Sequence, residues 1–198
     1  TTRGLGQAQY VLVIADGAVW IWNVVQDRFP HAVPQLDLFH AEEHLWAVAR
    51  ALYGRDTPEA RDWVAPLLAQ IRQDQTRKVI ATLVELKPRL EAAGQKKLQT
   101  QIEYFDHNAH RMKYKQVIAA REAREAGTAP AEQIQLANQP LGSGAIESTC
   151  RQYQCRFKRS GPFWTTAGDE ALMCLETFWR NGRWQEHYPH ARSSVGLN

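Results

Sequence analysis

The sequence predicts an α/β protein that is mostly helical, and three observations carry this prediction. An apolar run near the start has the β-branched and aliphatic character of a buried strand in a parallel sheet. Strand-like and helix-like segments then alternate once, which is the pattern of a β-α-β unit. From residue 41 onward the apolar residues keep a helical spacing. A length of 198 residues suits one domain with a sizeable insertion.

The predicted β-α-β unit occupies residues 1–40. Its first strand is Tyr10–Ala15, which ends in an acidic turn at Asp16. A helix follows over 18–27, and a second short strand within 31–39 carries Asp37 near its end. Open α/β sheets place their sites at the carboxyl ends of strands, so both aspartates are candidates. The helix residues that could cover one apolar face are Val19, Ile21, Trp22, Val24 and Val25.

Residues 41–139 are predicted to form a helical insertion. Gly54 is expected to end its first helix, and Thr57 before a proline is expected to cap the second. Pro66 should kink or restart that second helix. A third helix is expected to be capped by Thr76, and a fourth, longer one to run towards Ala126. The stretch 121–139 is the most linker-like part of the chain, although its sequence is also compatible with some helix.

Segment 140–184 is predicted to hold two further helices, followed by a tail over 185–198. A turn at 142–144 leads into a helix over 145–158, and a last helix spans 166–180. Their apolar residues keep a helical spacing and should face a core. The residues expected to point inward are Ile146, Cys150, Tyr153 and Phe157 in the first helix and Leu172, Leu175, Phe178 and Trp179 in the second.

Composition favours a globular protein and gives no sign of a membrane span. The hydrophobic content is 44%, and the apolar run Val11–Ala15 is far shorter than the roughly 20 residues of a membrane helix. Three cysteines are too few, and odd in number, for a disulfide framework, which favours a reducing cytoplasm. Because the chain opens with Thr and a strand begins almost at once, we expect it to be part of a longer sequence.

The charge distribution separates an acidic segment from a basic one. Residues 1–50 hold three arginines against five acidic residues. An acidic region beside a concentrated basic one suits a metal site that handles a polyanion, although ordinary surface scatter explains the pattern as well. The segment 151–159 contains no acidic residue, and its cations are Arg151, Arg156, Lys158 and Arg159.

Asp16 and Glu147 are the candidate catalytic and metal-binding residues. A carboxylate in the turn after a buried strand is a good ligand for a hard cation such as Mg²⁺, although an Asp-Gly turn explains Asp16 more simply. Glu147 lies in the first turn of a predicted helix, where complementing the helix dipole is the simpler explanation. The two residues are far apart in sequence, so they form one site only if the fold joins them.

Asp37, His40 and His44 form a second group of polar residues. The two histidines are spaced i and i+4 on one helix face, a spacing that is also found in zinc sites. No Glu-x-x-His signature or matching cysteine pair accompanies them. We therefore expect Asp37 and His40 to contact the residues that bind the metal without binding it themselves, or to start the helix.

Five short segments follow one another along the chain in a characteristic order and at characteristic spacings. Each segment alone is a weak signal, but the five together are specific for one family. They are Ala15–Asn23, Leu36–Leu45, Tyr104–Tyr114, Gly142–Arg151 and Arg156–Gly161. Together they resemble insertion-sequence DNA transposases of the acidic-triad (DDE) class. The Asp-x-x-His of Asp37 and His40 is similar to a motif of the Mutator-like eukaryotic relatives. The resemblance covers most of the chain, from about Val11 to Trp184.

The resemblance implies a partial RNase H-like fold, in which a large helical insertion separates the β-α-β unit from the helix that carries the glutamate. Asp16 matches the second acidic position of the triad and Glu147 the third. The first aspartate would precede residue 1, so the chain is expected to be inactive alone. If Asp16 were the first acidic residue and Asp37 the second, an antiparallel meander should join their strands, whereas the sequence predicts a helix.

The activity implied by the resemblance is metal-dependent DNA cleavage and strand transfer. Asp16 and Glu147 would hold Mg²⁺ or Mn²⁺, and the cations of 151–159 would contact DNA phosphates. Trp20 and Trp22 could stack on unpaired bases, although we expect at least one to pack in the core. The expected partner is DNA, with a homo-oligomer assembled on it in the cytoplasm.

Two other functions compete with this one. A non-catalytic DNA-binding module derived from a transposase would bind DNA without metal, and Asp16→Ala would leave that binding unchanged. An α/β enzyme with another substrate could use Asp37 and His40 as an acid–base pair. The second alternative lacks a Gly-x-Ser-x-Gly motif and a phosphate-binding glycine-rich loop.

Overall fold

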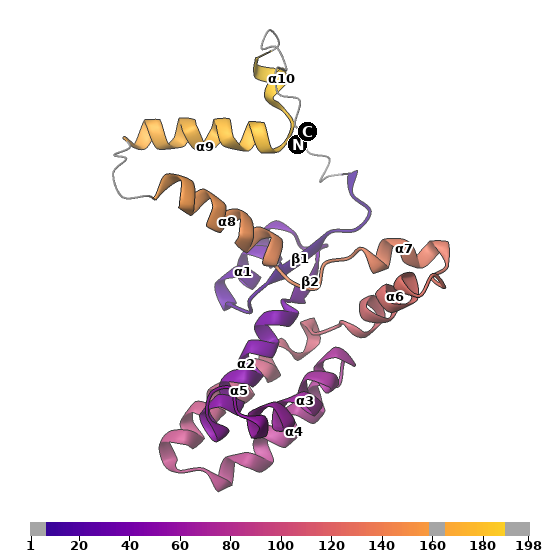
Figure 1. Ribbon diagram of the computed structural model, residues 1–198, viewed down its shortest axis with the longest axis vertical. Coiled ribbons are helices and arrows are strands. Elements are labelled where there is room, and N and C mark those ends of the chain that lie inside the picture. Colours follow the sequence, from indigo (N-terminus) through magenta and orange to yellow (C-terminus); the bar gives the residue numbers. More distant parts are fainter. Residues whose placement is uncertain (1–6, 159–164, 189–198) are drawn as a thin grey trace. The chain divides into compact units, whose positions relative to one another are not determined.

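The computed structural model describes residues 7–158 and 165–188 (Figure 1). It divides into two compact units, unit 1 over Thr1–Ser143 and unit 2 over Gly144–Asn198. Helices make up most of the described chain, and its sheet consists of two parallel strands. The prediction of an α/β protein that is mostly helical is confirmed.

Unit 1 begins with the predicted β-α-β unit. Its elements are β1 (Leu12–Ala15), α1 (Val19–Arg28) and β2 (Val33–Leu36). The strands pair in parallel along their whole length, so they stop together at one edge. On α1, Trp22 and Val25 are buried, whereas Val19 and Val24 are exposed. The apolar face of α1 is therefore narrower than predicted, because a short helix against two strands is covered on one side only.

The helical region of unit 1 starts with four long helices. They are α2 (Leu38–Tyr53), α3 (Pro58–Arg72), α4 (Thr76–Leu86) and α5 (Ala92–Asn108), joined by the short 3-10 helices η2 (Lys87–Arg89) and η3 (Ala109–Arg111). Gly54 ends α2 as predicted. Thr57 caps α3 as predicted, because its Oγ1 accepts a hydrogen bond from the Ala60 amide at 3.2 Å.

Two predictions concern helix boundaries. Helix α3 does not restart at Pro66 but continues through it, because burial of its neighbours Val64 and Leu67 outweighs the single backbone hydrogen bond that proline removes. Thr76 does not cap α4. Its hydroxyl is buried and contacts the Met112 sulfur at 3.7 Å instead.

The single long helix predicted to run to Ala126 is in fact broken. After α5 and η3 the chain starts again as α6 (Lys115–Glu125). Asp74, from the turn between α3 and α4, accepts hydrogen bonds from the Tyr114 amide at 2.6 Å and the Lys115 amide at 3.1 Å. This cap comes from a distant part of the sequence, so helical periodicity could not reveal it.

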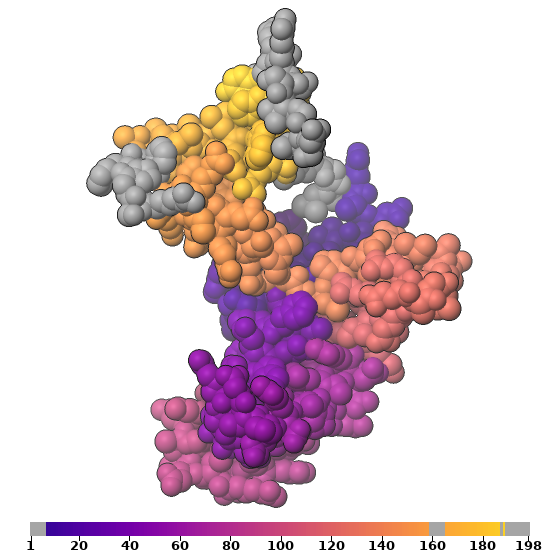
Figure 2. Space-filling view, viewed as in Figure 1, coloured from indigo at the N-terminus to yellow at the C-terminus, as the bar shows by residue number. Residues whose placement is uncertain are grey.

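The stretch 121–139 is not a linker. It contains the end of α6 and the helix α7 (Ala131–Ala137), and the two helices pack against each other. Arg121 joins them as well, through a hydrogen bond from its Nε to the Ala137 carbonyl at 3.2 Å. The α6–α7 pair forms a lobe of unit 1 in the space-filling view (Figure 2).

One hydrophobic core joins the sheet and the helices of unit 1. Leu36 from β2, Leu45 from α2 and Phe105 from α5 are all fully buried in it. The predicted segments 1–40 and 41–139 therefore share a core rather than forming separate bodies. The strand ends are supported directly by the helical region.

Unit 2 contains α8 (Gly144–Phe157), α9 (Thr166–Arg180) and α10 (Trp184–His187). Two residues of the stripe predicted to face a core are exposed, Ile146 at 67% and Cys150, whereas Tyr153 and Phe157 are half-buried. Trp179, predicted to point inward, is 60% exposed. The buried residue in the described part of unit 2 is Glu176, which is held by ion pairs. Few helices leave little room for an apolar interior, so polar contacts replace it.

Two findings bear on the predicted environment of the protein. Among the described residues, no helix combines the length and the apolar character that a membrane crossing requires. The three cysteines, Cys150, Cys155 and Cys174, are exposed.

Candidate functional site

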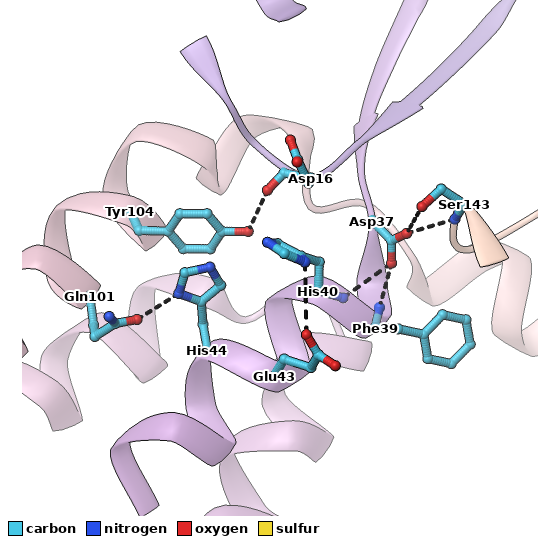
Figure 3. Close-up of polar contacts among 9 residues, drawn as sticks. All are labelled: Asp16, Asp37, Phe39, His40, Glu43, His44, Gln101, Tyr104 and Ser143. Carbon is cyan, nitrogen blue, oxygen red and sulfur yellow. Dashed lines mark hydrogen bonds and ion pairs between the residues drawn. The ribbon is translucent and has the colours of Figure 1, made fainter. Parts of the chain in front are cut away.

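Polar residues of unit 1 gather where β1 and β2 end (Figure 3). Asp16 follows β1 and Asp37 follows β2. Because the two strands are parallel and stop in register, both aspartates lie at the same edge of the sheet. Helix α2 starts directly after Asp37 and brings His40 and His44 to this edge, and α5 brings Tyr104.

Asp16 is exposed and lies in a tightly held turn. Its Oδ1 accepts a hydrogen bond from the Ala18 amide at 3.0 Å, and its carbonyl accepts one from the Tyr104 hydroxyl at 3.1 Å. Gly17 has a φ of 100°, and a Cβ there would come within 2.9 Å of the Tyr104 ring. An Asp-Gly turn therefore describes the local geometry, and the carboxylate is still open to solvent.

Asp37 is buried, and both of its carboxylate oxygens are engaged. Oδ1 accepts hydrogen bonds from the Phe39 amide at 2.8 Å and the His40 amide at 3.1 Å, which caps α2. Oδ2 accepts from the amide and from the hydroxyl of Ser143, both at 2.6 Å. Burial alone would raise the pKa of Asp37, but these hydrogen bonds favour the charged form and bring the pKa below its ordinary value. The predicted helix-starting role of Asp37 is confirmed.

Asp37 also ties the end of β2 to the last residues of unit 1, Leu141–Ser143, which we call the latch. Gly142 in the latch lies so close to the Phe39 ring that a Cβ would come within 2.5 Å of it. Only glycine fits at this approach. Helix α8 begins at the next residue after the latch, so Asp37 fixes the point where the chain leaves unit 1 towards Glu147.

His44 and Tyr104 form an aromatic stack at the base of the site. Their ring centroids lie 3.7 Å apart, with the planes 17° from parallel. His44 Nδ1 lies 2.7 Å from Gln101 Oε1, and it must be the donor because an amide oxygen only accepts. Burial lowers the pKa of His44, so the ring is neutral at neutral pH. His40 packs edge-on against His44 and pairs with Glu43 at 3.9 Å.

The segment Tyr104–Tyr114 contacts β2, α1 and the turn that follows β1. Tyr114 is fully buried, and its hydroxyl donates to the Leu36 carbonyl at 2.9 Å. The Arg111 guanidinium lies 4.5 Å from the centroid of the Trp22 ring. From sequence alone these tyrosines and Ser143 have no assigned role. The signal that points to them is their place in segments that resemble transposase motifs.

The residues predicted to contact DNA differ in exposure. Trp20 is 68% exposed, whereas Trp22 is 5% exposed and packs in the core. Stacking on a base therefore stays a prediction for Trp20, and the structure corrects it for Trp22. Arg151 lies exposed on α8, and Lys158 lies exposed directly after that helix.

Arg156, also predicted to contact DNA, pairs with Glu176 at 3.0 Å within unit 2. The Glu176 side chain is 4% exposed, and Arg180 pairs with it at 2.7 Å. Part of the Arg156 charge is therefore compensated inside the protein, and its contact with DNA stays a prediction. Arg159 lies outside the described residues.

Glu147 is exposed in the first turn of α8, where the sequence predicted it. It belongs to unit 2, and Asp16 belongs to unit 1. Within residues 7–158 and 165–188, no three His, Cys, Asp or Glu side chains form a group that could hold a metal ion. The spacing of His40 and His44 therefore does not build a zinc cluster there, and metal binding by Asp16 and Glu147 stays a prediction.

No protein-family model, curated protein or solved structure matches the chain. A function is therefore inferred from the residues at the strand ends, together with the motif resemblance. Of these residues, Asp16 combines exposure with a fixed main chain, and Asp37 combines burial with a structural role.

Proposed function

We propose that the chain supplies two of the three acidic residues of a transposase that cleaves and joins DNA with Mg²⁺ or Mn²⁺. The observation that carries the proposal is the exposed Asp16 carboxylate at the end of β1, in a turn held by Gly17 and Tyr104. The carboxyl end of a parallel strand is where α/β folds place their sites. The motif resemblance makes Asp16 the second acidic residue and Glu147 the third, within an RNase H-like fold.

The donor atoms at Asp16 fit a hard divalent cation. Both are carboxylate oxygens on an exposed side chain, and Oδ1 accepts a hydrogen bond from Ala18. Oxygen ligands of this kind are what Mg²⁺ and Mn²⁺ prefer. Asp16 and Glu147 would hold the ions, whose contribution is to polarise the phosphodiester and lower the pKa of the attacking hydroxyl or water.

Asp37 supports the proposal from the neighbouring strand. By accepting two hydrogen bonds from Ser143, it anchors the latch from which α8 starts. The glutamate position lies in the first turn of that helix. Asp37 would therefore support the chain segment that leads into the glutamate helix, rather than supply a metal ligand itself.

DNA would be held by the exposed cations on and after α8. Arg151 and Lys158 would contact phosphates, and Arg156 would contribute the part of its charge that Glu176 leaves uncompensated. Such contacts carry little sequence information and weaken as salt is added. Trp20 adds an exposed ring for stacking on an unpaired base. The proposal extends to a homo-oligomer assembled on DNA in the cytoplasm.

A nicking assay on DNA that carries the transposon ends tests the proposal. The assay uses the full-length product of the gene, and labelled DNA is incubated with Mg²⁺ or with EDTA. We expect Mg²⁺-dependent nicks that are lost in Asp16→Asn and in Glu147→Gln. The matched controls Asp27→Asn and Glu170→Gln change exposed carboxylates on α1 and α9 and should cleave like wild type. Cleavage that survives either site substitution removes that residue from the site.

A DNA-binding module without catalysis is the second candidate function. It is favoured by the hydrogen bond from Ala18 to Asp16, because this bond gives the carboxylate a structural role that needs no metal. Mn²⁺ titration followed by NMR separates the two candidates. A metal site at Asp16 would selectively broaden the amide signals of Gly17 and Ala18, and Asp16→Asn would abolish the effect. A binding module would show no selective broadening and would bind DNA equally in EDTA.

A further inference from the structure

Tyr104 contacts the proposed metal ligand through the main chain. Its hydroxyl reaches from α5 to the Asp16 carbonyl and donates a hydrogen bond at 3.1 Å (Figure 3). The hydroxyl is the donor in this bond, because a carbonyl oxygen only accepts.

The Tyr104 ring is itself held in place by neighbouring aromatic rings. It stacks on His44 at 3.7 Å, and the Phe105 ring meets it edge-on at 5.4 Å. His44 is fixed in turn by Gln101, at 2.7 Å. Gln101 and Tyr104 lie on one face of α5, at i and i+3. The hydroxyl thus has a set position, and that position determines where the Asp16 carbonyl can lie.

Gly17 brings the turn into direct contact with this ring. Its φ of 100° is in the left-handed region, and a Cβ would come within 2.9 Å of Tyr104 and 3.0 Å of Leu36. The Asp16 carbonyl is bonded to Tyr104, and its Oδ1 is bonded to the Ala18 amide. Rotation of the main chain at Asp16 would therefore break at least one of these two bonds.

We propose that Tyr104 is a positioning residue that holds the Asp16 turn, so that the carboxylate stays presented at the end of β1. The consequence for metal binding rests on the proposed function, whereas the held turn rests on the geometry alone. The DNA-cleavage proposal gives the Tyr104–Tyr114 segment no chemical role of its own. Positioning of the Asp16 turn is a function for that segment.

Tyr114 provides a matched control for this role. Its hydroxyl donates to the Leu36 carbonyl at 2.9 Å, which is the same kind of bond to the last residue of the other strand. Tyr114→Phe removes a phenol–carbonyl hydrogen bond but none of the hydrogen bonds that hold the Asp16 turn. An effect of Tyr104→Phe that Tyr114→Phe lacks is therefore specific to that turn.

The experiment compares wild type, Tyr104→Phe and Tyr114→Phe in the 198-residue chain by NMR. Amide hydrogen exchange of Ala18 reports the turn, and Mn²⁺ titration reports the carboxylate. Phenylalanine keeps the ring that stacks on His44, so the packing is retained. For Tyr104→Phe we expect Ala18 exchange about tenfold faster and Mn²⁺ binding about fivefold weaker, as the loss of one hydrogen bond implies. For Tyr114→Phe we expect both values within about twofold of wild type.

Each outcome decides the inference. Unchanged Ala18 exchange in Tyr104→Phe overturns it, whatever the result with Mn²⁺. Equal acceleration in both variants also overturns it, because Tyr104 would then stabilise unit 1 only in general. Faster exchange in Tyr104→Phe alone supports the positioning role. If wild type then binds no Mn²⁺, the positioning role stands and the proposed metal site fails.

Gln101→Leu is a second variant that leaves Tyr104 itself intact. It releases His44 from its hydrogen bond, so the stack behind the Tyr104 ring loosens. We expect Ala18 exchange to rise by about threefold, less than in Tyr104→Phe, because the hydroxyl can still reach the carbonyl. Slower or unchanged exchange would contradict the support assigned to His44.

Discussion

The two parallel strands of unit 1 end in aspartates with opposite environments. Asp16 is exposed, and the hydrogen bond that its carboxylate accepts comes from the Ala18 amide two residues on. Asp37 is 3% exposed, and its carboxylate accepts bonds from the start of α2 and from Ser143. One carboxylate is available to a ligand, and the other is occupied by the protein.

This difference shows that one position in a fold can serve chemistry or structure, depending on what packs over it. The latch covers the end of β2, and the N–H and O–H of Ser143 replace the water that Asp37 loses. A buried charge is tolerated only with such replacement. At the end of β1, the turn packs on Tyr104 through Gly17 and leaves the Asp16 carboxylate in solvent.

The largest expected effect comes from Asp37→Ala, compared with Asp16→Ala. Asp37→Ala removes the cap of α2 and leaves the Ser143 amide and hydroxyl without their acceptor. We expect the free energy of unfolding to fall by about 2–4 kcal/mol, against at most about 1 kcal/mol for Asp16→Ala. Urea unfolding followed by circular dichroism measures both losses. Equal losses would mean that the two strand ends do not differ in the way described.

The next effect is expected from Gly17→Ala, with Gly127→Ala as its control. Both glycines have positive φ, but a Cβ at Gly17 would meet Tyr104 within 2.9 Å, whereas nothing lies within 4 Å of one at Gly127. Both variants carry backbone strain, and only the first also disturbs packing. We expect a loss of about 2–3 kcal/mol for Gly17→Ala and about 1 kcal/mol for Gly127→Ala in the same unfolding experiment. A similar loss in both would argue against close packing of the Asp16 turn.

The smallest effect is the acid dependence of stability that Asp37 contributes. Burial alone would raise its pKa, but the hydrogen bonds from Ser143 and α2 place it below the ordinary value of 3.8. Its contribution is therefore present above 3.8 and is lost as pH falls from there through the folded pKa. Below about pH 4, the unfolding free energy should fall less steeply in Asp37→Asn than in wild type. A slope in Asp37→Asn as steep as that of wild type would contradict the assignment.

Several features were predictable from sequence because their causes lie within a few residues. Thr57 caps α3 and Gly54 ends α2, and in each case the bonding groups are local. The β-α-β unit was predictable for the same reason, since apolar runs and breakers mark its elements. The places of Asp16 and Asp37 after their strands followed from it.

Other features depend on residues that meet only in the folded chain. Asp74 caps α6 from another turn, which broke the helix predicted to continue to Ala126. The core stripe expected on α8 is exposed at Ile146 and Cys150, because periodicity shows that a helix has an apolar face but not that the whole face is covered. Arg156 looked like a free cation until Glu176 was found beside it.

By itself, the sequence determined the β-α-β unit, the aspartate after each strand and the helical character of the rest. These follow from periodicity and capping, which act over short stretches of chain. Only the tertiary structure decided that Asp16 is exposed and Asp37 is buried. Desolvation and hydrogen bonding depend on what the fold brings near a carboxylate, and Tyr104 and Ser143 reach these two from distant parts of the sequence.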